Sequence, residues 1–165
     1  QPHAIPDGES ASGAGRGGTG GFHLGPAEAR RARTCSAWPL ADLRHHDYYF
    51  DGFARLESRR GKSWTGIEFT FEGADGQPVA TYLAWKGSPG VAAPVRAKGL
   101  VEEMQPSDGG WWRVPTRTTA ELKAKGLALA ETAYSLTVRL WLDLDDAEAD
   151  AWFDDVKVLD MKAGR

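Results

Sequence analysis

Apolar and polar residues alternate with a period of two along much of the chain after residue 47. Even positions from 48 to 56 are apolar or small, whereas their odd neighbours include Asp51 and Arg55. In residues 66–72 the apolar side chains occupy the odd positions instead. A strand with one buried face shows this pattern because successive side chains point to opposite faces. The alternation therefore predicts strands at residues 48–57 and 66–72.

Turn-forming residues separate these strands from each other and from the next one. The Arg-Arg-Gly-Lys run at residues 59–62 is expected to turn the chain. The Asp75–Gly76 pair favours a tight hairpin turn. Residues 79–86 are therefore predicted to pair antiparallel with the strand before that turn.

The C-terminal part of the chain carries the clearest alternation. Residues 136–142 and 151–159 are predicted to form a hairpin through a turn at residues 145–148. Near the other end, two weaker strands are expected at residues 22–24 and 35–40.

The middle of the chain is less regular. Residues 87–110 contain three prolines and five glycines, which predicts a surface excursion of the kind that often carries function. Residues 111–118 are expected to form a strand broken by Pro115, and residues 120–130 at most one or two helical turns. Short strands with turns between them and almost no helical periodicity predict an all-β fold, a two-sheet antiparallel β-sandwich of the jelly-roll type.

The composition fits one domain. At 165 residues the chain can bury about two thirds of its unfolded surface. Residues 1–21 are rich in Gly and Ser and are expected to form a linker or a loose N-terminal edge, and residues 22–162 a single β-sandwich domain. The single cysteine, Cys35, can form no intramolecular disulfide and is expected to be a small core residue.

Charge and hydropathy exclude two classes of partner. The net charge is -3 and the acidic and basic residues are interspersed, so the chain lacks the basic surface of a nucleic-acid binder. No apolar run approaches the roughly 20 residues needed to span a bilayer, so we expect no membrane partner. The chain begins with Gln1, and we expect that a signal peptide or an upstream domain has been removed.

Tryptophan is unusually frequent, with seven residues spread along the chain. Some of these side chains are expected to lie outside the core. Large exposed aromatic rings generally mark a binding site, because an apolar ring in water costs free energy unless a partner covers it.

Three segments together resemble the β-jelly-roll carbohydrate-binding modules with a galactose-binding-like fold. They are Tyr48-Tyr49-Phe50-Asp51-Gly52-Phe53-Ala54-Arg55, the Trp112 to Pro115 strand with Ala128-Leu129-Ala130, and Ala151-Trp152-Phe153-Asp154-Asp155-Val156-Lys157-Val158. The last segment is similar to the closing strand of that family. The resemblance covers residues 34 to 160.

The resemblance implies a secreted, monomeric, non-catalytic module that binds a polysaccharide or oligosaccharide. Its partner is then a catalytic domain of the same parent chain, which it keeps near the polysaccharide. The family also implies a structural calcium ion held through Asp154 or Asp155, with no other cofactor required. The second ligand element of the family is not recognisable, since only Asp7 and Glu9 stand near the N-terminus, and two adjacent carboxylates cannot supply six to eight oxygen ligands alone.

Sugar recognition requires flat aromatic faces bordered by hydrogen-bonding side chains. Arg139 and Trp141 are predicted to project from the same side of one strand, about 7 Å apart. Glu68 is predicted to project from the non-core side of another, and we place all three on a concave sheet. Alternatively, Trp141 covers a sheet edge and Arg139 pairs with Glu68 or Asp143.

Further aromatic residues are candidate ligand contacts. Trp111 and Trp112 must face opposite sides of a strand, and by the family pattern Trp112 is the core residue and Trp111 the stacking candidate. Trp85 closes a strand beside the long excursion, although it could equally belong to the buried face. Tyr49 and Trp64 complete the set of candidates.

Enzyme motifs are absent from the sequence: it has no nucleophile elbow, phosphate loop or zinc-binding His pair. Glu68 and Glu72 stand roughly 13 Å apart on a strand, too far for a glycosidase pair. A structural or protein-interaction β-sandwich domain of a larger secreted enzyme, and a small jelly-roll polysaccharide lyase, stay as alternatives. The charge of the ligand is open, because basic residues could favour an acidic polysaccharide: Arg55, Arg59, Arg60, Lys62, Lys86 and Arg139.

Overall fold

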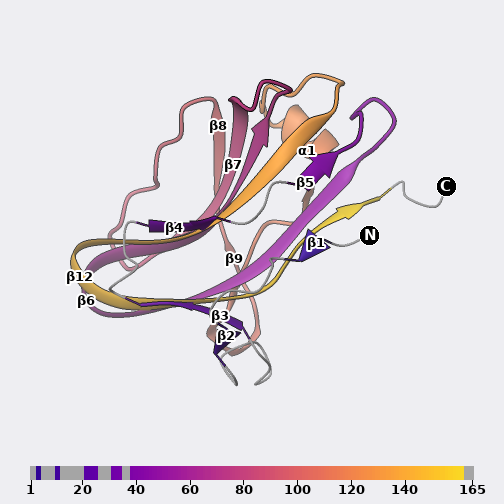
Figure 1. The fold of residues 1–165 in the computed structure, drawn as a ribbon. Helices are drawn as coiled ribbons and strands as arrows, with labels where there is room; N and C mark the ends of the chain where they lie inside the picture. Colours follow the sequence, from indigo (N-terminus) through magenta and orange to yellow (C-terminus); the bar gives the residue numbers. More distant parts are fainter. Residues whose placement is uncertain (1–2, 5–9, 12–20, 26–30, 35–37, 162–165) are drawn as a thin grey trace.

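Two long antiparallel strands, β6 (Tyr48–Glu72) and β12 (Tyr134–Asp160), run side by side and bend over together (Figure 1). The structure is a computed structural model that describes residues 3–4, 10–11, 21–25, 31–34 and 38–161. Because both strands continue through the bend, their two halves lie in two facing layers. The hydrogen-bonded sheet is therefore continuous from one layer to the other, and the architecture is an all-β sandwich.

The upper layer in Figure 1 contains residues 63–72 of β6 and residues 134–144 of β12. On one side, β7 pairs with β6, and β8 pairs with β7 in the parallel direction. On the other side, β5 and β4 pair with β12. The bounds of these strands are β4 (Arg31–Thr34), β5 (Trp38–Leu40), β7 (Pro78–Gly87) and β8 (Gly99–Glu103).

The lower layer contains residues 48–57 of β6 and residues 149–160 of β12. Short strands extend it on both sides: β1 and β3 pair with β12, β10 and β11 pair with β6, β2 pairs with β3, and β9 pairs with β10. Their bounds are β1 (His3–Ala4), β2 (Ser10–Ala11), β3 (Gly21–Leu24), β9 (Gln105–Pro106), β10 (Trp112–Arg113) and β11 (Arg117–Thr118).

One short helix, α1 (Thr119–Ala124), follows β11, and a 3₁₀ turn (Asp108–Gly110) precedes β10. Helix α1 begins with a capping box, in which the Thr118 side chain accepts a bond from the Glu121 amide and the Glu121 carboxylate accepts one from the Thr118 amide. The expectation of one or two helical turns in this region is confirmed.

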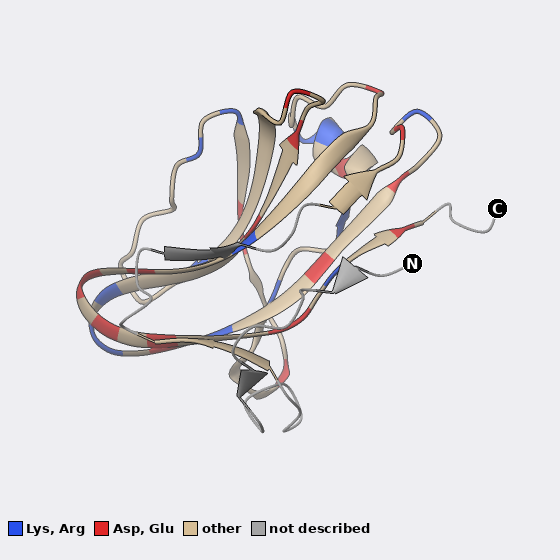
Figure 2. Ribbon diagram, viewed as in Figure 1, with Lys and Arg blue, Asp and Glu red and all other residues tan. Residues whose placement is uncertain are grey.

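The bend depends on backbone geometry that few residues tolerate. Gly61 has a φ of +74°, and a Cβ at this position would lie 2.3 Å from the Asp146 carbonyl oxygen. On β12 the register shifts on both sides of Glu148, so the two strands turn the corner by unequal steps. Basic and acidic residues alternate around the bend (Figure 2), and Arg60 lies within ion-pair distance of both Asp146 and Glu148.

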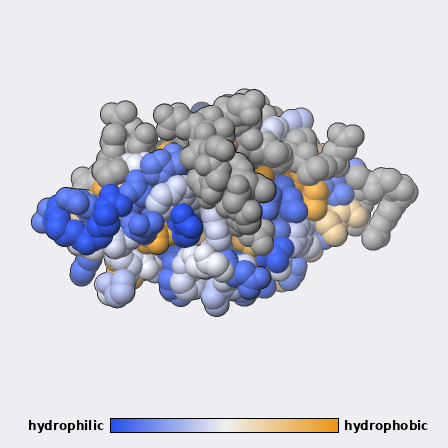
Figure 3. All heavy atoms as spheres, turned by 90° about the horizontal axis from the view of Figure 1, so that it is seen from below, coloured by the Kyte–Doolittle hydropathy of each residue, from blue (hydrophilic) through white to orange (hydrophobic). Residues whose placement is uncertain are grey.

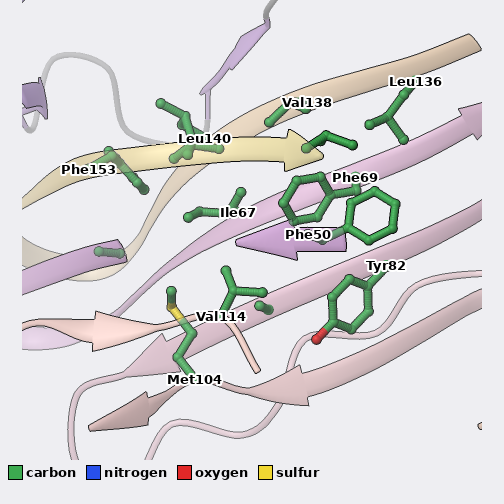
Figure 4. Packing of buried hydrophobic residues seen from close by; sticks show 14 of the residues in the cluster. Phe50, Ile67, Phe69, Tyr82, Met104, Val114, Leu136, Val138, Leu140 and Phe153 are labelled. Atoms are coloured by element: carbon green, nitrogen blue, oxygen red, sulfur yellow. The ribbon is translucent and has the colours of Figure 1, made fainter. Parts of the chain in front are cut away.

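The core fills the space between the layers (Figure 4). Phe50 of the lower layer packs edge-on against Phe69 and Phe71 of the upper layer, with ring centroids 5.1 and 5.7 Å apart. Leu136 and Leu140 of β12 are fully buried beside them. The predicted alternation is confirmed in both long strands, because these residues are the apolar positions of the pattern.

The open edge of the core is closed by a buried tyrosine and a carboxylate. The Tyr82 hydroxyl donates to Glu102 at 2.9 Å, and burial raises the pKa of this phenol. Burial alone would also raise the pKa of Glu102, but the bonds from Arg117 and Tyr82 outweigh it and lower the pKa. The ionised carboxylate therefore ties β8 to β11 across the edge.

Two connections differ from the sequence-based prediction. Residues 59–62 bend β6 without ending it, and residues 145–148 do the same in β12. Residues 136–142 and 151–159 therefore form no hairpin with each other, because each pairs with a different half of β6. The turn residues were identified correctly, but their effect is to bend a strand pair.

The segment after β7 is also more ordered than predicted, since residues 99–103 and 105–106 form β8 and β9. The hairpin through Asp75–Gly76 is confirmed, with Gly76 at a φ of +78°. The weak strand at residues 22–24 is confirmed as β3, and that at 35–40 in its second half as β5. Cys35 and most of residues 1–21 lie outside the described residues, so the domain boundary stays a prediction.

Candidate functional site

The seven predicted binding residues lie in three separate places. Tyr49 and Trp111 belong to the lower layer, and Trp85 borders a hollow at the end of β7. The remaining four line one hollow on the outer face of the upper layer: Trp64, Glu68, Arg139 and Trp141.

Strand register brings these four side chains together. Arg139 of β12 stands opposite Glu68 of β6, and Asp143 stands opposite Trp64. On the other side of β6, Thr81 of β7 is opposite Thr70. Successive side chains of a strand point to opposite faces. The residues between these positions point into the core, so the polar and aromatic side chains point to the outer face. Three neighbouring strands thus form the floor of the hollow.

Trp64 and Trp141 form what we call the aromatic platform. Their ring centroids are 6.0 Å apart and their planes are tilted by 32°. The Trp64 indole Nε1 donates to Asp143 Oδ2 at 3.0 Å, which fixes the orientation of this ring. Both residues are partly exposed. Such a pair of indoles offers an apolar surface on which the C–H face of a sugar ring can stack.

The Trp141 indole nitrogen has a different environment. Its Nε1 is buried and has no hydrogen-bond partner among the residues that the structure describes. A buried donor without a partner costs about 1–3 kcal/mol. Packing and the nearby Arg96 guanidinium hold the Trp141 ring, whereas a hydrogen bond to Asp143 orients the Trp64 ring.

Arg96 covers the aromatic platform. Its guanidinium carbon lies 5.2 Å from the Trp141 ring centroid and 5.7 Å from that of Trp64. Its Nε donates to Glu68 Oε2 at 2.5 Å. Arg139 approaches the other Glu68 oxygen to 3.8 Å and donates to Thr70 Oγ1 at 3.3 Å. The Glu68 side chain, only 7% exposed, is thus held between two guanidinium groups.

The hollow has a volume of about 910 Å³. Its lining contains three acidic side chains and two basic ones, which leaves one net negative charge: Glu68, Asp143, Asp145, Arg96 and Arg139. A smaller hollow of about 220 Å³ adjoins it on the side of Trp64, toward Lys62 and Val91. The site can therefore accept a ligand with several hydroxyl groups and one apolar face.

Sequence reasoning missed Arg96 and Asp143 as binding candidates. Asp143 shared the alternation of Arg139 and Trp141, so its place on the outer face followed from the same pattern. Arg96 belongs to the segment that was expected to carry function, but its only sequence signal is that it is the first basic residue after Lys86. Periodicity cannot show which strand a loop side chain will reach.

The structure contradicts the expected exposure of Trp111, whereas Trp112 packs against the core as expected but is only half-buried. Trp111 is only 5% exposed, whereas Trp112 is half-buried, packs against the core and carries the Lys86 ammonium 4.2 Å from its ring centroid. The alternation was right, since the two rings face opposite ways. The family pattern named the wrong ring as exposed, because the outer face of this layer is itself covered by side chains.

Trp85 is also largely buried, at 7% exposure. It projects from the outer side of β7, because the inward positions of this strand are Ala80, Tyr82 and Ala84. Trp85 borders a second hollow of about 430 Å³, together with Lys86, Glu103 and Trp112. It does not join the hollow that contains Trp141.

The outer face of the lower layer carries a second aromatic cluster. The Arg55 guanidinium carbon lies 4.6 Å from the Trp152 ring centroid and 5.5 Å from that of Trp111. His23 stacks on the other side of Trp152 and bonds to Asp150 at 2.7 Å. We call these residues, with Arg59, the lower cluster. Burial alone would raise the pKa of Asp150, but the bonds from Arg59 and His23 lower it.

Tyr49 lies near the other end of the same layer, opposite Thr118 of β11. It contacts Arg113, whose guanidinium donates two bonds to the buried Asp51 at 2.9 and 2.8 Å. The bonds to Asp51 raise the pKa of Arg113. Tyr49 therefore lies beside the Arg113–Asp51 ion pair, and the structure does not bring it near Trp141.

Asp154 and Asp155 lie within β12, where the register with β6 shifts between Asp154 and Lys157. The Asp155 amide donates to Asp154 Oδ1 at 2.9 Å, and Asp155 has a φ of +50°. Within the described part of the chain, no group of three or more His, Cys, Asp or Glu side chains could hold a metal ion. Asp7 and Glu9 lie outside that part, so the calcium expectation stays a prediction.

Comparisons with known proteins define the fold. No family model and no curated protein sequence matches the chain. A family 12 xyloglucanase from Bacillus licheniformis is similar in structure, with a TM-score of 0.50 and 9% identity over 86% of this chain and 81% of that chain. The chain has a β-sandwich fold.

A second similar structure contains the N-terminal CBM22-1 and GH10 modules of endo-1,4-β-D-xylanase 10B from Clostridium thermocellum, complexed with xylohexaose. The TM-score is 0.48 at 13% identity over 92% of this chain. The match spans 24% of the length of that chain. Among the described residues, no helix is long and apolar enough to cross a membrane.

Proposed function

We propose that this protein is a non-catalytic carbohydrate-binding module that binds a polysaccharide through the aromatic platform. The single observation that carries the proposal is the hollow of about 910 Å³ with Trp64 and Trp141 in its wall and charged side chains beside them. Aromatic faces bind the apolar side of a sugar ring, and carboxylate and guanidinium groups bind its hydroxyls. In this proposal the ligand lies along the outer face of the upper layer.

The module acts within a larger secreted protein. As in the galactose-binding-like jelly-roll modules that the sequence resembles, it is monomeric and keeps a catalytic domain of the same parent chain near the polysaccharide. A few stacking contacts and hydrogen bonds support affinities in the micromolar to millimolar range.

The spacing of the carboxylates favours binding over hydrolysis. Glycosidases require two carboxyl groups about 5–9.5 Å apart. Asp143 stands opposite Trp64, four residues along β6 from Glu68, which corresponds to about 13 Å at 3.3 Å per residue. Glu68 is in addition bonded to Arg96. This pair is too widely spaced to attack and protonate one glycosidic bond.

The test is native affinity electrophoresis with neutral and acidic polysaccharides in the gel. We expect retardation by at least one polymer. Trp141→Ala and Trp64→Ala should each weaken it about tenfold, the effect of losing one stacked ring in a site of low affinity. Trp152→Ala is the matched control, because it removes an indole from the opposite outer face.

Three results would contradict the proposal. Equal retardation of the wild type and of both platform variants would place the binding site elsewhere. An absence of retardation by every polymer would favour the alternative of a packing domain in a larger enzyme. Release of reducing ends or of unsaturated products from the same polymers would instead indicate a hydrolase or lyase.

A further inference from the structure

Arg96 occupies the position that a stacked ligand needs. Its guanidinium lies over both indoles of the platform, at 5.2 and 5.7 Å from the ring centroids. A planar cation on an indole face gains cation–π attraction and covers the apolar surface at the same time. A sugar ring and the Arg96 guanidinium therefore compete for one surface.

The segment that carries Arg96 is tied to the sheet at its two ends. The Ser88 amide donates to the Ser63 carbonyl at 2.8 Å, and the Thr81 amide donates to the Lys98 carbonyl at 3.2 Å. Between these ties, Val95 is 86% exposed, so the neighbour of Arg96 packs against little. The bond to Glu68, a bond from Arg96 Nη1 to the Val95 carbonyl oxygen at 2.9 Å and the contacts with the indoles hold the Arg96 side chain on the platform. A change of rotamer can remove it without breaking a strand.

We propose that Arg96 is a displaceable cover of the site, and that a neutral, hydroxyl-rich glycan is the ligand that displaces it. This inference rests on the proposed function. Once Arg96 leaves, Glu68 is a buried carboxylate with Arg139 at 3.8 Å as its remaining cation. Such a group must accept new hydrogen bonds, because an unpaired buried charge is unstable.

The charges around Glu68 select the ligand. Adjacent hydroxyl groups of a neutral sugar can donate to Glu68 and replace the Arg96 bond. A uronate or sulfate offers an anion instead, and it would enter a hollow whose three carboxylates outnumber its two guanidinium groups. Like charges in a partly desolvated site repel, so an acidic polysaccharide is disfavoured.

Four of the six basic residues that could have attracted an acidic ligand have other partners, whereas Arg139 lines the hollow and Lys62 lines the smaller one beside it. Arg59 bonds to Asp150, Arg60 contacts Asp146, and Lys86 lies 3.3 Å from Glu103. Arg55 is stacked in the lower cluster. The charge pattern therefore supports a neutral ligand.

The experiment compares Arg96→Ala with Val95→Ala, a matched control that shortens the exposed neighbour and keeps the cover. Affinity is measured by isothermal titration with soluble xyloglucan and hydroxyethylcellulose as neutral probes, and with alginate and polygalacturonate as acidic probes. We expect Arg96→Ala to bind the neutral probe about threefold to tenfold more tightly than wild type, since ligand no longer displaces a stacked cation. Val95→Ala should bind as wild type does.

Stopped-flow fluorescence gives a second readout. If the cover must leave before the ligand stacks, the observed binding rate of the wild type levels off at high ligand concentration, at the rate of opening. For Arg96→Ala the rate should rise linearly with concentration. Near-ultraviolet circular dichroism checks that each variant retains the native fold.

Each contrary outcome has a distinct meaning. Weaker binding by Arg96→Ala than by wild type would overturn the inference and make Arg96 a direct ligand contact, while the proposed function would stand. Unchanged affinity, or preferred binding of alginate or polygalacturonate, would overturn it as well. Failure of both the proposed function and the inference would show as an absence of binding to all four probes.

Discussion

Each outer face of the sandwich carries a cluster of one arginine and two tryptophans, and the two clusters are arranged differently. On the upper layer, Arg96 lies over Trp64 and Trp141. On the lower layer, Arg55 lies between Trp111 and Trp152. Both faces thus place one guanidinium against two indoles, yet only the upper cluster lines the hollow of about 910 Å³.

The difference lies in the backbone that carries each arginine. Arg55 belongs to β6, stands opposite Trp152 in the strand register, and has a buried Nε without a partner in the described residues. Arg96 belongs to the segment between β7 and β8 and is bonded to a carboxylate at the site. An arginine fixed by a central strand fills space permanently, whereas one on a connecting segment can leave. The comparison teaches that the same contact is structural on one face and displaceable on the other.

The lower side of the molecule has a mixed surface. Viewed from below, the lower side shows hydrophobic areas only as separate patches between hydrophilic ones where described residues are visible (Figure 3). In the lower cluster, Arg55 lies over both indoles, and Trp111 is only 5% exposed. Of the two indoles of this cluster, Trp152 alone is partly exposed, so they form no exposed pair like Trp64 and Trp141.

Replacement of one tryptophan on each face should give the largest difference. Trp111→Ala removes a ring that is 5% exposed and should lower the free energy of unfolding by about 3–5 kcal/mol. Trp141→Ala removes a partly exposed ring and should cost about 1–2 kcal/mol while weakening glycan binding. Urea denaturation followed by circular dichroism measures both. Equal losses of stability would show that the two clusters are equally structural.

The bend that separates the two faces can be tested next. Gly61→Ala places a Cβ 2.3 Å from the Asp146 carbonyl oxygen at a φ of +74°, and we expect it to cost about 3 kcal/mol. Gly76→Ala is the matched control, because its φ is +78° but no atom lies within 4 Å of the added Cβ. It should cost only about 1 kcal/mol, the price of the backbone conformation. Similar melting temperatures of the two variants would contradict a tightly packed bend.

Local patterns predicted the faces of the strands but not how the strands meet. The alternation around Arg139 and Trp141 placed both side chains on the outer face beside Glu68, as the register confirms. The same alternation could not show that residues 59–62 bend a strand. A Gly with a positive φ serves a hairpin and a bend equally well, and the choice depends on pairing with residues more than eighty positions away.

Only the site residues that lie on strands could be predicted from the sequence. The sequence did not show which face of β7 is buried, because Leu83 and Trp85 on one face are large and apolar. In the structure the other face, with the small residues Ala80 and Ala84, points into the core. They fit there because Phe69 and Phe71 already fill the space between the layers. Arg96 had no periodic signal at all, since its place over the platform depends on the path of a segment outside the strands.

Acid sensitivity should show the smallest difference. Asp150 of the lower cluster has a lowered pKa, because the bonds from Arg59 and His23 outweigh the effect of burial. The folded protein therefore binds this proton less readily than the unfolded chain, whose aspartates titrate near pH 4. The stabilisation is fully present above that pH and is lost as the pH falls through the folded value.

Above pH 5, Asp150→Asn should consequently lower the free energy of unfolding by at most about 1 kcal/mol, because solvent screens the Arg59–Asp150 ion pair. Below pH 4 the difference in stability between the variant and the wild type should shrink steadily. Asp146→Asn is the matched control, because it removes the same charge from a side chain that is 95% exposed. Urea titrations between pH 3 and pH 7 measure both profiles. The free energies of unfolding of Asp150→Asn and wild type could instead differ by the same amount at every pH. Asp150 would then stabilise the lower cluster through the geometry of its hydrogen bonds and not through its charge. The contrast with the upper face would then rest on backbone attachment alone.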